Sequence, residues 1–178
     1  VTGQEIYTSD VTLPRMLHAR VLRSAHPHAR IAKIDPSAAE RLGAVCLTFK
    51  DIPKIKYNER LVSIPRSTYK DRFLLAEKAC HVGEAIAAVA AETPYQAWDA
   101  LKAVKVEYEI LPFIVDEQKA LEPGAPAIHE GGNRSDVQTY ERGSVEKGFA
   151  EADIVLEQSY RTESELHTPI EAHGCVAK

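Results

Sequence analysis

The stretch HVGEAIAAVAAETPYQAWDALKAVKVEYEILP, residues 81–112, decides the fold of this chain. Within it, residues 85–91 are small and apolar and come directly after Gly83 and Glu84. A short, continuous apolar run bounded by a turn residue is typical of a strand that is buried on both faces. The sequence therefore predicts a central strand at 85–91.

A helix and a second strand follow in the same stretch. Thr93 before Pro94 is a helix start, because threonine caps free N–H groups and proline fits the first helical position. We expect a helix that reaches about residue 104, with one buried face formed by Ala97, Trp98, Leu101 and Val104. Residues 105–111 then alternate apolar and charged, which predicts a strand with one wet side. If the two strands lie parallel in one sheet, they form a right-handed βαβ crossover.

The residues before this stretch predict further short elements. MLHARVLRS, residues 16–24, alternates like a half-buried strand, and HPHARIAKID, residues 26–35, predicts a turn and a second strand. Asp35 before Pro36 indicates a brief helix that ends at Gly43, and residues 44–49 are typical of a buried strand.

Two regions have weaker patterns. Residues 50–78 contain prolines and many charges, which predicts a long excursion with one irregular strand around Leu61. After Pro112, one or two helical turns at 116–121 precede a loop rich in proline and glycine. A helix capped by Ser144 and two long strands, at 154–163 and 165–178, complete an α+β chain.

Composition excludes several classes of protein. Hydrophobic residues make up 44% of the 178 residues and the net charge is −4, with basic residues scattered, so neither a nucleic-acid partner nor a membrane surface is indicated. The chain has no signal-peptide pattern at its start and no apolar run near the ~20 residues needed to span a bilayer. Cys46, Cys80 and Cys175 form no CxxC pair and are expected to be free thiols, which predicts a cytoplasmic protein.

The segment ELHTPIEAHGC, residues 165–175, is rich in potential ligands. As a strand, it would place His167, Glu171, His173 and Cys175 on one face, with neighbouring side chains on that face about 6.5–7 Å apart. A divalent ion could bridge that spacing, but tetrahedral zinc usually takes ligands that converge from two elements, and no second cluster stands out. The sequence favours no metal site here, and instead a polar surface that faces more protein.

Two other places hold candidate functional residues. In SAHPHARI, residues 24–31, His26, His28 and Arg30 alternate beside a strand, which allows an anion site but favours a turn shaped at an interface. Glu84 lies in a possible ligand loop, although the chain has neither a GxGxxG fingerprint nor a P-loop, and the glutamate could equally pair with Arg30. Taken from its residues, the chain is a domain without a complete catalytic apparatus.

An ordered series of motifs resembles the amino-terminal region of the molybdenum-cofactor subunit of the xanthine dehydrogenase and aldehyde oxidase family. LHARVLRSAHPHARIAKID has Ala25 where the family usually has proline, and residues 81–112 have Ala85 in place of another proline. The remaining pieces also fit in order: VTG at 1–3 with Tyr7 and Asp10, His129–Glu130, Asn133, GFAEAD at 148–153 and HTPIEAHGCVA at 167–177.

The resemblance implies a domain organisation and a chemistry. Residues 1–112 would be an α/β hammerhead domain, residues 113–139 a connector, and residues 140–178 the incomplete start of a molybdopterin-binding domain. The family hydroxylates a carbon centre with oxygen derived from water, using the metal to activate that water and a glutamate as base. That glutamate and the substrate-binding residues belong to later parts of the family's subunit, so no catalytic, cofactor-binding or metal-ligating residue is assigned to this chain.

The resemblance also implies cofactors and partners. The complete enzyme would hold molybdopterin, with [2Fe–2S] and FAD on partner domains or subunits, and would form a homo-oligomer of the full assembly. Residues expected at interfaces with these partners, or with the remainder of the molybdenum subunit, are His26, His28, Arg30, Glu84, His167, Glu171 and His173.

Three hypotheses stay open from sequence. In the first, the chain is the amino-terminal portion of a molybdenum hydroxylase large subunit, structural in role and inert alone. In the second, it is a free-standing, non-enzymatic hammerhead module that assembles with a separate cofactor subunit. In the third, it is a small metalloprotein that uses His173, Cys175 and their neighbours.

Overall fold

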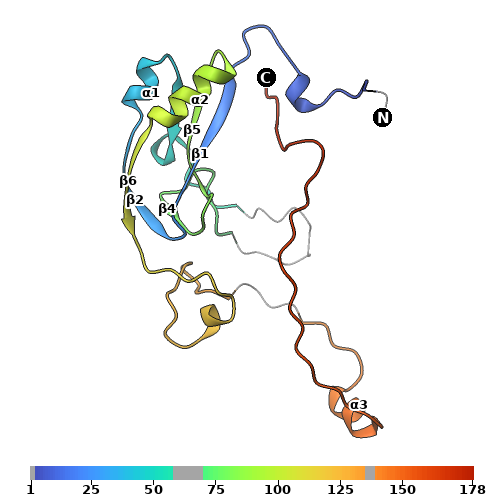
Figure 1. Ribbon diagram of the computed structural model, residues 1–178. Coiled ribbons are helices and arrows are strands. Elements are labelled where there is room, and N and C mark those ends of the chain that lie inside the picture. Colours follow the sequence, from blue (N-terminus) through green and yellow to red (C-terminus); the bar gives the residue numbers. More distant parts are fainter. Residues whose placement is uncertain (1–2, 58–69, 135–138) are drawn as a thin grey trace. The chain divides into compact units, whose positions relative to one another are not determined.

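The computed structural model describes residues 3–57, 70–134 and 139–178. The chain divides into two compact units. One unit is Arg15–Asp136, and the other joins Val1–Pro14 to Val137–Lys178. Figure 1 shows the chain coloured along its sequence, from blue at the amino terminus to red at the carboxyl terminus.

The larger unit contains an antiparallel sheet in the order β1-β5-β3. Its strands are β1 (His18–Arg23), β5 (Ala85–Ala91) and β3 (Val45–Thr48). The small apolar run therefore forms the central strand, as the sequence predicts. Four of its seven residues are buried, because the strand is paired on both edges and a helix covers one of its faces.

A second antiparallel sheet has the order β4-β2-β6. Its strands are β4 (Lys78–Ala79), β2 (Ala29–Asp35) and β6 (Lys105–Ile110). The condition for a βαβ crossover is not met, because the strands before and after the helix belong to different sheets. Strand β6 pairs antiparallel with β2, from Asp35 opposite Lys105 to Ala29 opposite Ile110. The backbone N–H and C=O groups of β6 therefore bond to β2 and not to β5.

Helix α2 (Pro94–Ala103) covers one face of the first sheet, and its residues Ala97 and Ala100 are fully buried there. These alanines, with Val89 and Ala91 of β5, are members of the main core cluster. The prediction that Trp98 belongs to the buried face is wrong: its side chain is 48% exposed. The guanidinium of Arg20 lies 5.7 Å from its ring centroid, so the indole is used at the surface as a cation–π partner.

The short helix α1 (Ser37–Arg41) begins one residue later than the sequence predicts, with Pro36 at its cap. The Asp35 carboxylate still accepts a hydrogen bond from the Ser37 backbone N–H at 3.0 Å. The Ser37 side chain first, and this backbone bond second, lower the pKa of Asp35. Gly43 ends this region with φ +80°, the left-handed conformation that glycine adopts without a steric cost.

Helix α2 provides a test of capping. The Thr93 hydroxyl accepts a hydrogen bond from the Gln96 backbone N–H at 3.1 Å. Thr93→Ala should lower the free energy of unfolding by about 0.5–2 kcal/mol, because that N–H loses its partner. Urea unfolding followed by the fluorescence of Trp98, the single tryptophan, measures the loss. Thr93→Ser keeps the acceptor and should stay close to the parent; equal losses for both variants would contradict the capping role.

The connections of the larger unit are irregular. A 3₁₀ turn, η2 (Phe49–Asp51), begins the excursion, and a second, η3 (Lys119–Leu121), confirms the predicted helical turn after Pro112. The strand predicted around Leu61 lies outside the described residues. Past η3, the Asn133 side chain organises the loop: its oxygen accepts from the Ile128 N–H, and its amide donates to the carbonyls of Ala120 and Pro126.

The smaller unit contains a 3₁₀ turn, η1 (Thr8–Asp10), and helix α3 (Val145–Glu151). Ser144 caps α3 as predicted, accepting a hydrogen bond from the Lys147 N–H at 3.1 Å. The two predicted C-terminal strands are wrong, since residues 152–178 have no strand in the described structure. Thr168 has φ +41°, which breaks the extended backbone that a strand needs.

Candidate functional site

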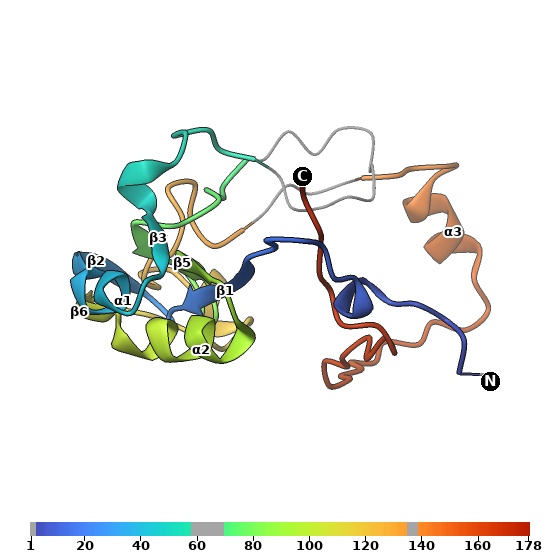
Figure 2. The same ribbon diagram turned by 90° about the horizontal axis from the view of Figure 1, so that it is seen from above.

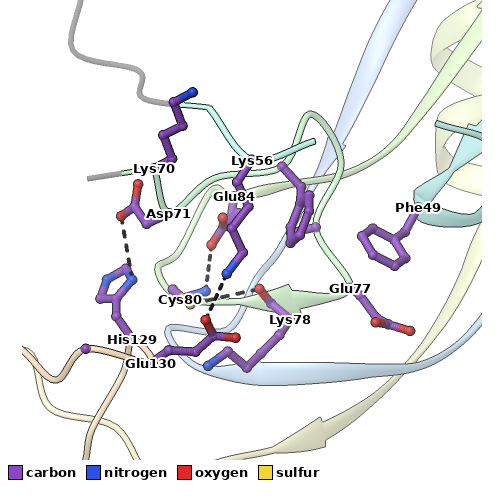
Figure 3. Close-up of a pocket in the computed structure, with 13 residues that line it drawn as sticks. Phe49, Lys56, Lys70, Asp71, Glu77, Lys78, Cys80, Glu84, His129 and Glu130 are labelled. Atoms are coloured by element: carbon purple, nitrogen blue, oxygen red, sulfur yellow. Dashed lines mark hydrogen bonds and ion pairs between the residues drawn. The ribbon is translucent and has the colours of Figure 1, made fainter. Parts of the chain in front are cut away.

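A cavity of about 370 Å³ lies in the larger unit where three loop segments meet. Figure 3 shows the residues that line it, and they come from 49–56, 70–84 and 129–131. These segments are distant in sequence but are held close together. Strands β4 and β5 fix the segment 70–84, and the Asn133 side chain fixes the loop that contains residues 129–131. This cavity gathers charged side chains from all three segments.

Glu84 lies at the inner wall of the cavity and is only 9% exposed. Its Oε2 accepts a hydrogen bond from the Cys80 backbone N–H at 2.6 Å and lies 3.3 Å from Nδ1 of His81. Gly83 has φ +91°, which lets the backbone turn so that the carboxylate folds back over its own loop. The suggested pair with Arg30 is not formed: Glu84 organises the 80–84 turn instead.

Three polar contacts connect the 128–131 loop to the cavity wall, and Figure 3 draws two of them, Lys56–Glu130 and Asp71–His129. Lys56 Nζ lies 2.9 Å from the Glu130 carboxylate, and Asp71 lies 3.6 Å from Nδ1 of His129. Lys78 Nζ donates to the Ile128 carbonyl at 2.9 Å. The Lys56 ammonium also lowers the pKa of Glu130, which is exposed, so this pair contributes little to stability.

The cavity holds one thiol, that of Cys80. Burial raises its pKa, and the nearby Glu84 carboxylate raises it further. The thiol therefore stays protonated at neutral pH, whereas nucleophilic chemistry requires the thiolate. No group of three or more His, Cys, Asp or Glu side chains that could hold a metal ion occurs among the described residues. The geometry supports a polar junction that fixes three loops.

The side chains of His26, His28 and Arg30 in SAHPHARI do not converge on one site. His28 is buried at 5% exposure, and its Nδ1 lies 2.6 Å from the Pro112 carbonyl, which requires Nδ1–H to donate. The His26 ring meets Tyr108 edge-to-face at 4.7 Å, and Arg30 pairs with Glu109 at 2.8 Å. All three thus contact β6 or the residues that follow it. Arg30 already has a carboxylate partner, which disfavours the anion site; contacts of these residues with a further domain stay a prediction.

The ligand-rich segment of the smaller unit also differs from its predicted form. Glu171 accepts a hydrogen bond from the Thr8 backbone N–H at 2.7 Å, so it caps the turn η1. His167, His173 and Cys175 are exposed, and the alternating strand face that would align them is absent from the described structure. Their role at an interface stays a prediction, and the geometric argument for a metal site on one strand face no longer holds.

The Thr8–Glu171 hydrogen bond has a pH signature. Bonds from the Thr8 backbone and side chain lower the pKa of the Glu171 carboxyl. The contact is therefore present at neutral pH and is lost as the pH falls through that depressed pKa. Thr8→Pro should raise the carboxyl's titration midpoint, since proline has no N–H yet fits the first position of the turn after the extended Tyr7. Carboxyl carbon NMR measures the midpoint; an unchanged value would contradict the contact.

Little in the sequence indicates this cavity. Lys56 and Asp71 lie in the excursion where no periodic pattern exists, and the spacing of Cys80 indicates only a free thiol. His129–Glu130 is singled out solely by the family resemblance. The one sequence signal for this cavity is therefore the His129–Glu130 pair, which keeps its place in the family's order of motifs inside a loop rich in proline and glycine.

Comparison with known proteins identifies the family. Residues 2–112 match the aldehyde oxidase and xanthine dehydrogenase a/b hammerhead domain, and residues 128–178 match the molybdopterin cofactor-binding domain. The first match spans more than half of the chain, and the chain belongs to the aldehyde oxidase and xanthine dehydrogenase family. The predicted α+β class, with a hammerhead domain and a partial molybdopterin-binding domain, is confirmed.

Individual relatives agree with this assignment. A probable xanthine dehydrogenase subunit of Bacillus subtilis (strain 168) is 40% identical over 99% of this chain and 23% of its own length. The nicotinate dehydrogenase large molybdopterin subunit of Eubacterium barkeri is 37% identical over 99% of this chain and 41% of its own. The aldehyde oxidoreductase structure from Desulfovibrio gigas has a TM-score of 0.71 at 30% identity, covering 86% of this chain and 18% of that one. The chain thus spans less than half the length of these relatives.

Proposed function

We propose that this chain serves as the amino-terminal portion of the large subunit of a molybdenum hydroxylase, an oxidoreductase that hydroxylates a carbon centre with oxygen from water. One observation carries the proposal: both family matches occur in this chain in order, on residues 2–112 and 128–178. The role of the chain itself is structural, because the cavity fixes loops and contains no activated nucleophile among its described residues.

The molybdenum cofactor belongs to the complete enzyme in this proposal. The described residues 139–178 of the second match are all exposed, so no buried side chain among them is available to enclose the pterin. We therefore derive no chemical step through the cofactor from these residues. Its binding groups would come from other parts of the subunit, in keeping with a glutamate base that is not assigned to this chain.

The partners follow from the same proposal. The chain would assemble with the remainder of its molybdenum subunit and with iron–sulfur and FAD domains or subunits, and the assembly would be a homo-oligomer in the cytoplasm. Relatives support partner subunits through their names, such as the large chain of carbon monoxide dehydrogenase from Afipia carboxidovorans. No helix among the described residues has the length and apolar character to cross a membrane.

Metal analysis tests the proposal. The isolated 178 residues should carry no molybdenum and show no hydroxylase activity, whereas the native subunit, purified through a tag at its own gene, should carry stoichiometric molybdenum. Molybdenum and activity in the isolated chain would contradict its structural role. A molybdenum-free native product that binds a separate cofactor subunit would instead establish the free-standing module.

A further inference from the structure

One face of the sheet β1-β5-β3 is apolar and has no covering element among the described residues of the larger unit. The register places Ala19 opposite Ala90 and Ala90 opposite Val45, and it places Val21 opposite Ala88 and Ala88 opposite Leu47. Directly opposed residues point to the same side of a sheet. These two rows define the outer face, which consists of Ala19, Val21, Val45, Leu47, Ala88 and Ala90.

The opposite face of the same sheet is the covered one. Val89 and Ala91 of β5 belong to the core cluster with Ala97 and Ala100 of α2, and Leu22 and Cys46 pack against that cluster. Figure 2 shows α2 running along this side of the strands. A sheet that buries one face commonly places polar residues on the other. Here the two rows of the outer face contain no polar residue.

The larger side chains of the outer face are substantially exposed: Val45 by 58%, Leu47 by 44% and Val21 by 42%. Ala88 and Ala90 of the central strand and Ala19 of β1 have short side chains, so the surface between the branched side chains is slightly concave. Contiguous exposed apolar surface usually marks a contact with another protein surface. The absence of charge from these two rows is typical of interfaces that stay closed, since separable interfaces keep more polar groups.

We propose that the outer face is covered by an uncharged, apolar segment of the same large subunit, from the part beyond these 178 residues. This inference rests on the proposed function. The length of the relatives supports it: the chain matches 23% of the Bacillus subtilis subunit, so most of such a subunit is left to supply the cover. A cover within one polypeptide is permanent, which agrees with a face that has no charged residue in its two rows.

A charge placed on this face tests the inference. Leu47→Lys is made both in the 178-residue chain and in the complete subunit, with Ile110→Lys as the matched control. Ile110 is also an exposed apolar strand residue, at 52%, but it lies in the other sheet. In the isolated chain both variants should unfold at the parent's urea midpoint. In the complete subunit Leu47→Lys should lower the yield of folded protein by about tenfold or more, since it buries an unpaired charge.

Amide hydrogen exchange of the parent protein gives a second, independent measurement. The amides of β3 should exchange at least about tenfold more slowly in the complete subunit than in the isolated chain, because a covered edge strand opens less often. Equal exchange, or a complete subunit that tolerates Leu47→Lys as well as Ile110→Lys, would overturn the inference. Loss of stability in the isolated Leu47→Lys chain would also overturn it, since the 178 residues would then cover the face themselves.

Other outcomes separate this inference from the proposed function. If the isolated chain forms a dimer that Leu47→Lys dissociates, the occupant is a second copy and the inference fails. If the native subunit is long and carries molybdenum but Leu47→Lys has no effect in it, only the inference fails. If the native product is no longer than these 178 residues, the proposed function is wrong, and the inference that rests on it is wrong as well.

Discussion

Replacing Ile86 by alanine should lower the free energy of unfolding of the larger unit by about 2–5 kcal/mol, because the substitution removes buried methyl groups and leaves a cavity. Ile86 is fully buried, and among the described residues Ile86 and Val89 are the largest fully buried side chains. It belongs to the central strand β5, whose other residues are mostly alanine and offer little volume to fill the gap. Collapse around the cavity is therefore limited, and we expect the upper part of that range.

Urea unfolding followed by Trp98 fluorescence measures the effect of Ile86→Ala. Ile55→Ala is the matched control, since the same groups are removed from a side chain that is 71% exposed. We expect the control to change the free energy of unfolding by less than about 0.5 kcal/mol. Similar losses for both variants would show that Ile86 is not part of the core.

Enlarging a buried alanine of α2 should have the second largest effect. Ala100→Leu is expected to destabilise the larger unit by about 1–3 kcal/mol, since a well-packed contact must open to admit extra methylene groups. Ala97 and Ala100 are both fully buried, and Ala91 of β5 is nearly so, which indicates a close approach of helix to sheet. Leucine is a good helix former, so helix propensity would not cause the loss.

Asp99→Leu is the control for this substitution, because it adds an apolar side chain at the neighbouring, exposed position of the same helix. It should leave the urea midpoint near that of the parent, whereas Ala100→Leu should shift it markedly downward. An Ala100→Leu chain as stable as the parent would mean that α2 does not lie against β5 through its alanines.

The elements of the larger unit are easier to predict from sequence than their pairing. The strand at 85–91 and the helix capped by Thr93 are predictable because apolar runs and caps are local signals. The assignment of β6 to a different sheet from β5 depends on its ladder with β2, some seventy residues upstream. Such long-range pairing leaves no trace in the periodicity of either strand.

The C-terminal segment shows a different limit. Residues 167–175 alternate polar and apolar like a strand, yet an isolated strand has no ladder to satisfy its backbone, and the described structure provides none. Its glutamate, Glu171, instead caps a turn at the other end of the chain. The cavity is hard to predict for a related reason: its side chains come from three irregular loops, where no pattern distinguishes one lysine or aspartate from another.

The most direct test of the proposed function is the intact mass of the native product of the gene that encodes these residues, measured after purification through a carboxy-terminal tag. We expect one polypeptide that contains all 178 residues, is several times longer, and carries stoichiometric molybdenum. A product limited to the 178 residues and the tag would contradict it, and the chain would then act as a separate module.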